Sequence, residues 1–64
     1  MRNDERVAVA KVGYQAYGDT AEWKNYRGDP MPRWDDLGDR IQTCWIMATS
    51  AAVNYAITPP SQRP

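Results

Sequence analysis

The feature that most constrains this chain is its shortage of aliphatic side chains. Val, Ile and Leu together supply eight of the 64 residues, and the seven aromatic residues are three Trp and four Tyr. A buried aromatic side chain covers ~150–250 Å² of surface. If the chain folds alone, its Trp and Tyr side chains must therefore supply much of the core. Domains of this length are marginally stable, and oligomerisation is one common way to complete them.

The charged and reactive residues exclude several classes of protein. Eight Lys and Arg balance eight Asp and Glu, which argues against a protein that coats a nucleic-acid polymer. The chain has no His and one cysteine, Cys44, so an internal disulfide is excluded and a structural zinc site is not expected. We expect no metal and no cofactor. Because His is the usual general base near neutral pH, we also expect no enzymatic activity.

The sequence contains no segment typical of membrane insertion or export. Its apolar runs are shorter than the stretch of about eighteen residues that a bilayer-spanning helix needs. No basic segment followed by an apolar one resembles a signal peptide. We therefore expect no contact with a membrane and a cytoplasmic location, where a single unpaired cysteine is normal.

An amphipathic helix is predicted over residues 4–17. Asn3 or Asp4 can cap it, and Gly18 is well placed to end it. Gly13 inside the helix costs up to ~1 kcal/mol relative to Ala, and so small a residue allows another helix or a ligand to approach closely. The apolar positions form two neighbouring stripes: Ala8, Val12 and Ala16 on one, and Ala10, Tyr14 and Tyr17 on the other.

A long, partly ordered loop is predicted between Gly18 and Arg33. Pro30 and Pro32 prevent a continuous helix there. Loops of this length in small domains are usually functional or disordered. Its middle part, from Ala21 to Tyr26, has the composition of a single helical turn.

A second amphipathic helix is predicted over residues 36–57, with Asp35 or Asp36 as its cap. Together the two helices predict an all-α helical hairpin. One apolar stripe of the second helix is predicted to form the core: Ile41, Cys44, Trp45, Ala48, Ala51, Ala52 and Tyr55. A second apolar edge, formed by Ile46, Val53 and Ile57, is predicted as an interface with another chain, so that the fold is completed by homo-oligomerisation.

The remaining residues divide the chain into a domain and a tail. Residues 1–57 are predicted to form a single small helical domain. Residues 58–64 contain three prolines and are predicted to be a flexible tail.

Two groups of reactive side chains have a structural as well as a functional interpretation. Asp35, Asp36 and Asp39 suit acid–base chemistry or a divalent cation, but they also complement the dipole at the start of the second helix, which we favour. Cys44 lacks a His that would activate its thiol, and we favour a small buried core residue there.

The loop carries the most suggestive chemistry, because aromatic rings alternate with cations and an amide. Aromatic faces stack on bases, and Lys and Arg bind phosphates. As an alternative, Trp23, Tyr26 and Trp34 fold inward as the missing core, which we favour for Trp34 alone. The predicted ligand-binding residues are Tyr14, Tyr17, Trp23, Lys24, Asn25, Arg27, Arg33, Trp34 and Gln42.

The order of these residues resembles a known family. The stretch from Val9 to Tyr14 is followed by a loop, the corner Pro32-Arg33-Trp34, the acidic turn Asp35-Asp36-Leu37, and an Ala-rich helix that carries Gln42 and ends near Val53. This order is similar to the bacterial and phage versions of the ryanodine-receptor repeat domain, over roughly residues 6–57. Where that family often carries His and Asn in its first helix, this chain has Gly13-Tyr14. The chain also resembles short accessory proteins of phages that infect actinobacteria.

The resemblance implies a compact helical module in defence or counter-defence, and not an enzyme. The leading hypothesis is a phage counter-defence protein that sequesters a nucleotide-derived immune signal, such as a cyclic nucleotide or an ADP-ribose derivative. In it the aromatic residues stack on the base, the loop cations bind phosphates, and Asn25 or Gln42 bonds to sugar or base. The alternative is a protein-interaction module that docks on a host or phage protein through the second helix.

Overall fold

The computed structural model describes residues 2–63 and confirms an all-α hairpin. Met1 and Pro64, which the sequence assigns to the domain and the tail, lie outside the described residues. Residues 2–63 contain no β-strand, only an isolated antiparallel bridge between Lys24 and Pro30. Their elements are α1 (Asn3–Thr20), the 3₁₀ turn η1 (Trp34–Asp36), α2 (Asp39–Ile57) and the 3₁₀ turn η2 (Pro60–Gln62).

Helix α1 is longer than the sequence predicts, because it continues through Gly18 to Thr20. The prediction that Gly18 ends the helix is therefore wrong. A Cβ atom at Gly18 would lie 2.5 Å from the indole ring of Trp23, so the glycine makes room for this ring instead. Asp4 and Glu5 do lie in the first turn, but the N-cap is Arg2, and no side chain caps it.

Helix α2 begins at Asp39, three residues later than predicted. Trp34, Asp35 and Asp36 form the separate turn η1, and an extended backbone at Leu37 and Gly38 divides it from α2. The predicted capping by Asp35 or Asp36 is therefore wrong. Gly38 is the N-cap, and Asp39 complements the helix dipole from the first turn.

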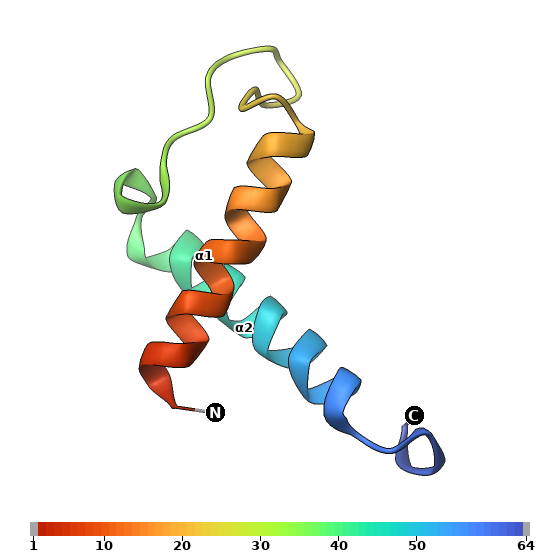
Figure 1. Ribbon diagram of the computed structural model, residues 1–64. Helices are drawn as coiled ribbons and strands as arrows, with labels where there is room; N and C mark the ends of the chain where they lie inside the picture. Colours follow the sequence, from red (N-terminus) through yellow and green to blue (C-terminus); the bar gives the residue numbers. More distant parts are fainter. Residues whose placement is uncertain (1, 64) are drawn as a thin grey trace.

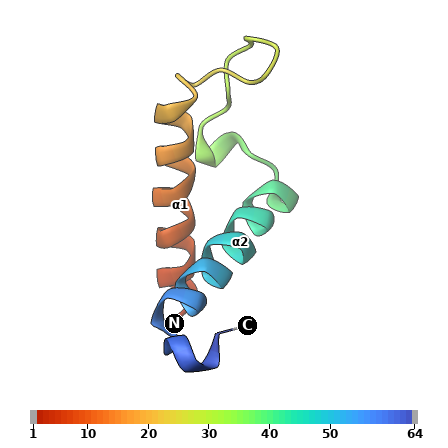
Figure 2. The ribbon, with the colours of Figure 1, turned by 90° about the vertical axis from the view of Figure 1, so that its right-hand side faces the viewer.

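The two helices cross obliquely, and their ends diverge (Figures 1 and 2). Gly13 lies at the crossing, where an added Cβ atom would stand 2.9 Å from the side-chain methyl of Thr49. The prediction that Gly13 allows close approach of another helix is thus confirmed. Near the start of α1, Arg6 Nε donates a hydrogen bond to Ser50 Oγ over 3.1 Å, and Ser50 is buried.

The core of the molecule is aromatic. Tyr14 is 4% exposed and meets three indoles edge-on, with ring centroids 5.8 Å from Trp23, 6.0 Å from Trp34 and 5.3 Å from Trp45. Trp45 also meets Tyr17 at 5.5 Å. We call these five residues the aromatic cluster. It agrees with the prediction that Trp and Tyr side chains supply much of the core.

Helix α2 turns a different side to α1 than the sequence predicts. The prediction that the stripe from Ile41 to Tyr55 forms the core is wrong except at Trp45, which is half-buried, because its other members are all exposed, Cys44 included. The half-buried or buried residues of α2 are Gln42, Trp45, Ile46, Thr49, Ser50 and Val53. Positions three and four apart share one side of a helix, so Gly13 and Arg6, which contact Thr49 and Ser50, fix this side toward α1.

This orientation changes the residues available for the predicted interface. Ile46 and Val53 are half-buried on the side of α2 that bears Thr49 and Ser50. Ile57, at 75% exposure, is the one exposed member. Contact of these three residues with another chain stays a prediction.

The residues after α2 turn back on its end, far from the loop (Figure 1). Arg63 Nε donates to the backbone oxygens of Tyr55 at 3.1 Å and Thr58 at 3.0 Å. The Arg63 guanidinium also lies 4.6 Å from the centre of the Tyr55 ring. Arg63 thereby adds hydrogen bonds to carbonyl groups at the end of the helix, where backbone donors are few. The flexibility of the tail stays a prediction.

Candidate ligand-binding loop

The loop after α1 reverses the chain through two left-handed residues, Glu22 (φ 58°) and Trp23 (φ 56°). This backbone conformation is uncommon for residues other than glycine. Three contacts hold it. The Trp23 backbone N–H donates to the Gly18 oxygen over 2.8 Å, its indole N–H donates to an Asp19 carboxylate oxygen over 3.0 Å, and the ring packs on Gly18. The loop is therefore fastened to the last turn of α1.

The tip of the loop is a small ordered turn around Asn25. The side-chain oxygen of Asn25 accepts the backbone N–H groups of Arg27 at 2.8 Å and Asp29 at 3.0 Å. The backbone N–H of Asn25 donates to the backbone oxygen of Asp29 over 2.8 Å. Gly28 takes the left-handed φ of 84° that the turn requires. Asn25 thus positions the tip, and its amide oxygen is already used within the loop.

Four of the nine predicted ligand-binding residues instead make hydrogen bonds or ring contacts that hold the fold together. The Tyr14 hydroxyl donates to the Pro32 oxygen over 2.6 Å, and the Gln42 amide donates to the Trp34 oxygen over 2.8 Å. Both bonds tie the returning loop to the helices. Trp23 and Trp34 are half-buried against Tyr14. Inward folding, the alternative weighed for Trp23 and favoured for Trp34, is therefore what these two rings do.

Tyr17 and Arg33 stand at the border of the aromatic cluster. Tyr17 is 53% exposed and presents one side to Trp45. The guanidinium carbon of Arg33 lies 4.2 Å from the centre of the Trp23 ring, a cation–π contact, while the residue itself is exposed. Arg33 therefore keeps N–H groups toward solvent although its position is fixed by an aromatic face.

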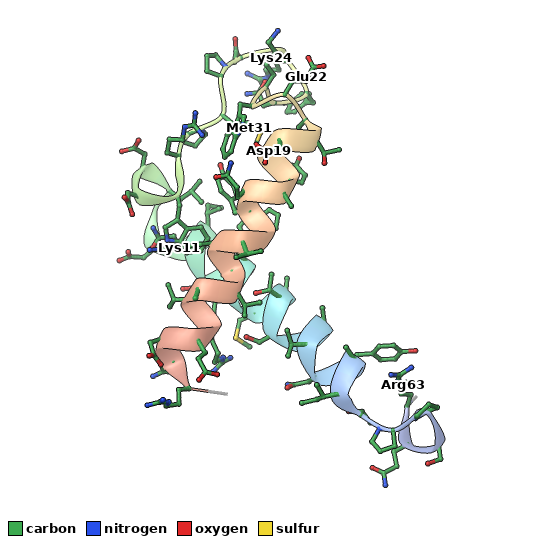
Figure 3. The ribbon with its side chains drawn as sticks, viewed as in Figure 1. Lys11, Asp19, Glu22, Lys24, Met31 and Arg63 are labelled. Carbon is green, nitrogen blue, oxygen red and sulfur yellow. The ribbon has the colours of Figure 1, made fainter. Side chains whose placement is uncertain are left out.

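Lys24 and Arg27 are exposed to solvent, together with Tyr26. The Tyr26 ring is 89% exposed, and the Arg27 guanidinium lies 5.3 Å from its centre and donates to its hydroxyl over 2.9 Å. Lys24 lies at the end of the molecule opposite Arg63, beside Glu22 and beyond the last turn of α1 (Figure 3). The tip thus gathers Lys24, Tyr26 and Arg27 on one exposed turn.

The electrostatics of the cluster follow from burial. Burial raises the pKa of the Tyr14 phenol above its ordinary value of 10.0, the nearby Tyr17 adds to the rise, and the Arg33 cation opposes it. Tyr14 therefore stays protonated and keeps donating to Pro32 at neutral pH. This hydroxyl is a structural donor and is not available as a base.

One exposed loop residue and one hollow lie outside the predicted site. Tyr26 is not among the predicted ligand-binding residues, although its ring is the most accessible one of the loop. A hollow of about 210 Å³ on α2 is lined by Cys44, Trp45 and Ala48. The position of Tyr26 between Asn25 and Arg27 could have indicated its role in the loop. The sequence could not indicate the hollow, because its location depends on which side of α2 faces α1.

Further properties of the described residues frame what the protein can do. Among residues 2–63, no three His, Cys, Asp or Glu side chains gather closely enough to hold a metal ion. Neither helix in that range is long and apolar enough to cross a membrane. No protein-family model, curated protein or solved structure matches this chain. The similarity to ryanodine-receptor repeat domains and to phage accessory proteins therefore stays a prediction.

Proposed function

We propose that the protein is a non-enzymatic binder of a small anionic ligand with an aromatic ring, and that the ligand binds at the tip of the loop after α1. A nucleotide-derived molecule has this chemistry. The observation that carries the proposal is the group of exposed loop residues Lys24, Tyr26, Arg27 and Arg33, of which Arg27 lies over the Tyr26 ring and Arg33 over the Trp23 ring.

The cations of this group have no carboxylate partner. The ion pair within 4.0 Å in the described range joins Arg2 to Glu5, far from the loop in sequence, and Lys24, Arg27 and Arg33 form none. Arg27 and Arg33 are instead held by aromatic faces. A phosphate that binds there breaks no ion pair, and its bonds to the guanidinium groups are charge-assisted.

The aromatic half of the proposed site is Tyr26. Base stacking on an exposed aromatic side chain contributes ~1–3 kcal/mol per base. At 89% exposure, Tyr26 offers its ring to a base without a rearrangement of the core. The bonds from Arg27 and Asp29 to Asn25 order the turn before ligand arrives, which lowers the entropy lost on binding.

The biological role that the resemblance implies follows from such binding. Sequestration needs a ligand held away from its effector and no turnover, which suits a site made only of cations and rings. For this chain the signal molecule would be a cyclic nucleotide or an ADP-ribose derivative in the cytoplasm of an infected host cell.

The test is titration calorimetry of the full chain against cyclic dinucleotides, ADP-ribose and cyclic ADP-ribose isomers. We expect micromolar binding of at least one ligand, and weakening of about tenfold or more in Arg27→Ala and Tyr26→Ala, since each loses a charge-assisted or stacking contact. Lys11→Ala removes an exposed cation of α1 outside the loop and serves as the matched control. Absence of binding across the whole panel, or equal loss in the control, contradicts the proposal.

A further inference from the structure

The chain leaves more surface uncovered than a compact monomer of its size. Its accessible surface is 5073 Å², whereas a folded 7.3 kDa monomer is expected to expose about 4200 Å². The excess of about 900 Å² is close to the roughly 800 Å² that each partner buries in a stable protein–protein interface. The molecule is also elongated, at 43 × 21 × 16 Å. A second chain packed against one side would cover the excess surface and make the assembly less elongated.

Part of this uncovered surface is a continuous stripe on the outer side of α2. Six exposed positions at helical spacing carry no charged side chain and are mainly apolar: Ile41, Cys44, Ala48, Ala51, Ala52 and Tyr55. We call them the outer stripe. It runs from the first to the last turn of α2, about 21 Å. The other exposed positions of the helix are mixed, with polar residues such as Thr43 and Asn54 beside the apolar Met47 and Ile57.

The outer stripe has the shape of a helix-pairing surface. Its middle consists of small residues, which let a second helix approach closely, and its two large side chains stand at the ends. The hollow of about 210 Å³ beside Cys44, Trp45 and Ala48 lies in its first half. In its second half the one large side chain is Tyr55, which is half-exposed. The stripe therefore presents both a hollow and a ring of a size to fill one.

We propose that the outer stripe pairs with the outer stripe of a second copy of this chain, with the two α2 helices antiparallel. In this arrangement Tyr55 of each copy enters the hollow beside Trp45 of the other, and Ala48 of one copy lies opposite Ala52 of the other. The pairing is closed by a twofold axis, so one type of contact is made twice. It does not depend on ligand binding by the loop.

The antiparallel direction follows from the position of the hollow. A parallel pair would set hollow against hollow and Tyr55 against Tyr55, which leaves both hollows unfilled. The antiparallel pair also places opposite ends of the helix dipoles side by side. Tyr55 is fixed for this contact from its own chain, because Arg63 lies 4.6 Å from the centre of its ring and binds the last carbonyls of α2.

The first test is the mass of the full chain by sedimentation equilibrium. We expect twice 7.3 kDa for the parent chain. Ala51→Glu places a charge within the stripe at an exposed helical position that Glu tolerates, and we expect a monomer with unchanged helical circular dichroism. Thr43→Glu, at an exposed polar position outside the stripe, is the matched control and stays dimeric. Tyr55→Ala weakens the dimer by about thirtyfold or more.

The second test fixes the direction of pairing by oxidative cross-linking. In the antiparallel pair, the two Ala51 positions lie near the twofold axis, and the two Cys44 positions lie about 18 Å apart along the helices. The double variant Cys44→Ala, Ala51→Cys therefore forms a covalent dimer readily, and the parent chain does not. This test uses variants that keep small residues at both positions, so it remains informative if the charged variant does not fold.

Three results would overturn the proposal. One is a mass of 7.3 kDa for the parent chain at every concentration up to about 300 µM, and another is a dimer that survives Ala51→Glu. The third is cross-linking through Cys44 that is as fast as through position 51, which contradicts the antiparallel direction. A monomer that binds a different protein through the outer stripe likewise replaces the second copy with a host or phage partner. Ligand binding by the loop is measured separately, so its failure leaves these outcomes unaffected.

Discussion

The two sides of α2 differ in what covers them, and the side with more apolar residues is the exposed one. On the inner side, Trp45 packs against Tyr14 and Tyr17 of α1, and Thr49 fits against Gly13. On the outer side, Ala48 and Ala51 are exposed although their side chains are apolar. The difference shows that the partner of a helix face, and not its hydrophobicity, decides burial here. On α1, Gly13 makes room for α2, and Gly18 makes room for the Trp23 ring of the loop.

The aromatic residues also differ in their roles according to whether they are buried or exposed. Tyr14 is enclosed by three indoles, while Tyr26 and Tyr55 stand outside at opposite ends of the molecule. The first holds the fold together, and the other two are assigned here to ligand binding and to self-association. Substitutions that change only one of these two groups test whether their roles are separate.

The largest expected effect comes from Tyr14→Ala. Removal of a large buried side chain costs ~3–5 kcal/mol, and a chain of this length has a total stability of roughly 3–10 kcal/mol. We therefore expect the variant to be largely unfolded, with red-shifted tryptophan fluorescence. Ile57→Ala removes an apolar side chain that is 75% exposed and changes the free energy of unfolding by less than about 0.5 kcal/mol. Equal losses in the two variants would contradict the aromatic core.

The next effect separates the two glycines of α1. At Gly18 an added Cβ meets the rigid Trp23 ring at 2.5 Å, whereas at Gly13 it meets the end of the smaller Thr49 side chain at 2.9 Å. We expect Gly18→Ala to lower the free energy of unfolding by about 1–3 kcal/mol. Gly13→Ala costs less, because a small shift relieves the contact and Ala gains up to ~1 kcal/mol of helix propensity. Denaturant unfolding measures both, and the reverse order would show that Trp23 does not pack on Gly18.

How far the sequence predicts this fold can be judged at Gly18 and Cys44. The helices, the hairpin and the aromatic core follow from local periodicity and composition. The continuation of α1 through Gly18 does not, because it depends on Trp23, which a left-handed turn brings back onto the helix. Likewise the stripe that contains Cys44 has a regular helical pattern, but the crossing at Gly13 turns a different side of α2 inward.

The candidate site shows the same limit. The sequence identifies a cationic, aromatic loop, and Lys24 and Arg27 are indeed exposed there. It cannot show that the Tyr14 hydroxyl and the Gln42 amide are used by the backbone of Pro32 and Trp34, because these bonds join segments eighteen and eight residues apart.

A further prediction concerns alkaline pH. Because burial raises the pKa of the Tyr14 phenol, the folded chain holds this proton more tightly than the unfolded chain does. The stabilisation is therefore constant below a pH of about 10 and is lost as the pH rises through the higher folded value. Denaturant unfolding from about pH 8 to pH 11 measures this loss. Tyr14→Phe lacks the proton and should lose less stability over that range, and a parallel decline in both chains would contradict the assignment.

The smallest effect is expected at the far side of the helix crossing. Ser50→Ala removes the buried acceptor of the 3.1 Å hydrogen bond from Arg6 and should cost about 0.5–1.5 kcal/mol in the free energy of unfolding. Thr43→Ala, at an exposed position of the same helix, is the control and should change stability by less than about 0.5 kcal/mol. If the two variants cannot be distinguished, Arg6 does not join the helices in solution.

The most direct test of the account is a nuclear Overhauser measurement on the parent chain in solution. The account predicts cross-peaks from the Tyr14 ring protons to the indoles of Trp23, Trp34 and Trp45, whose ring centroids lie 5.3–6.0 Å away. It predicts none from the Tyr26 ring to these indoles. Cross-peaks from Tyr14 to Trp45 alone, with Trp23 and Trp34 at random-coil shifts, would contradict it, because the loop aromatic residues would then lie outside the core.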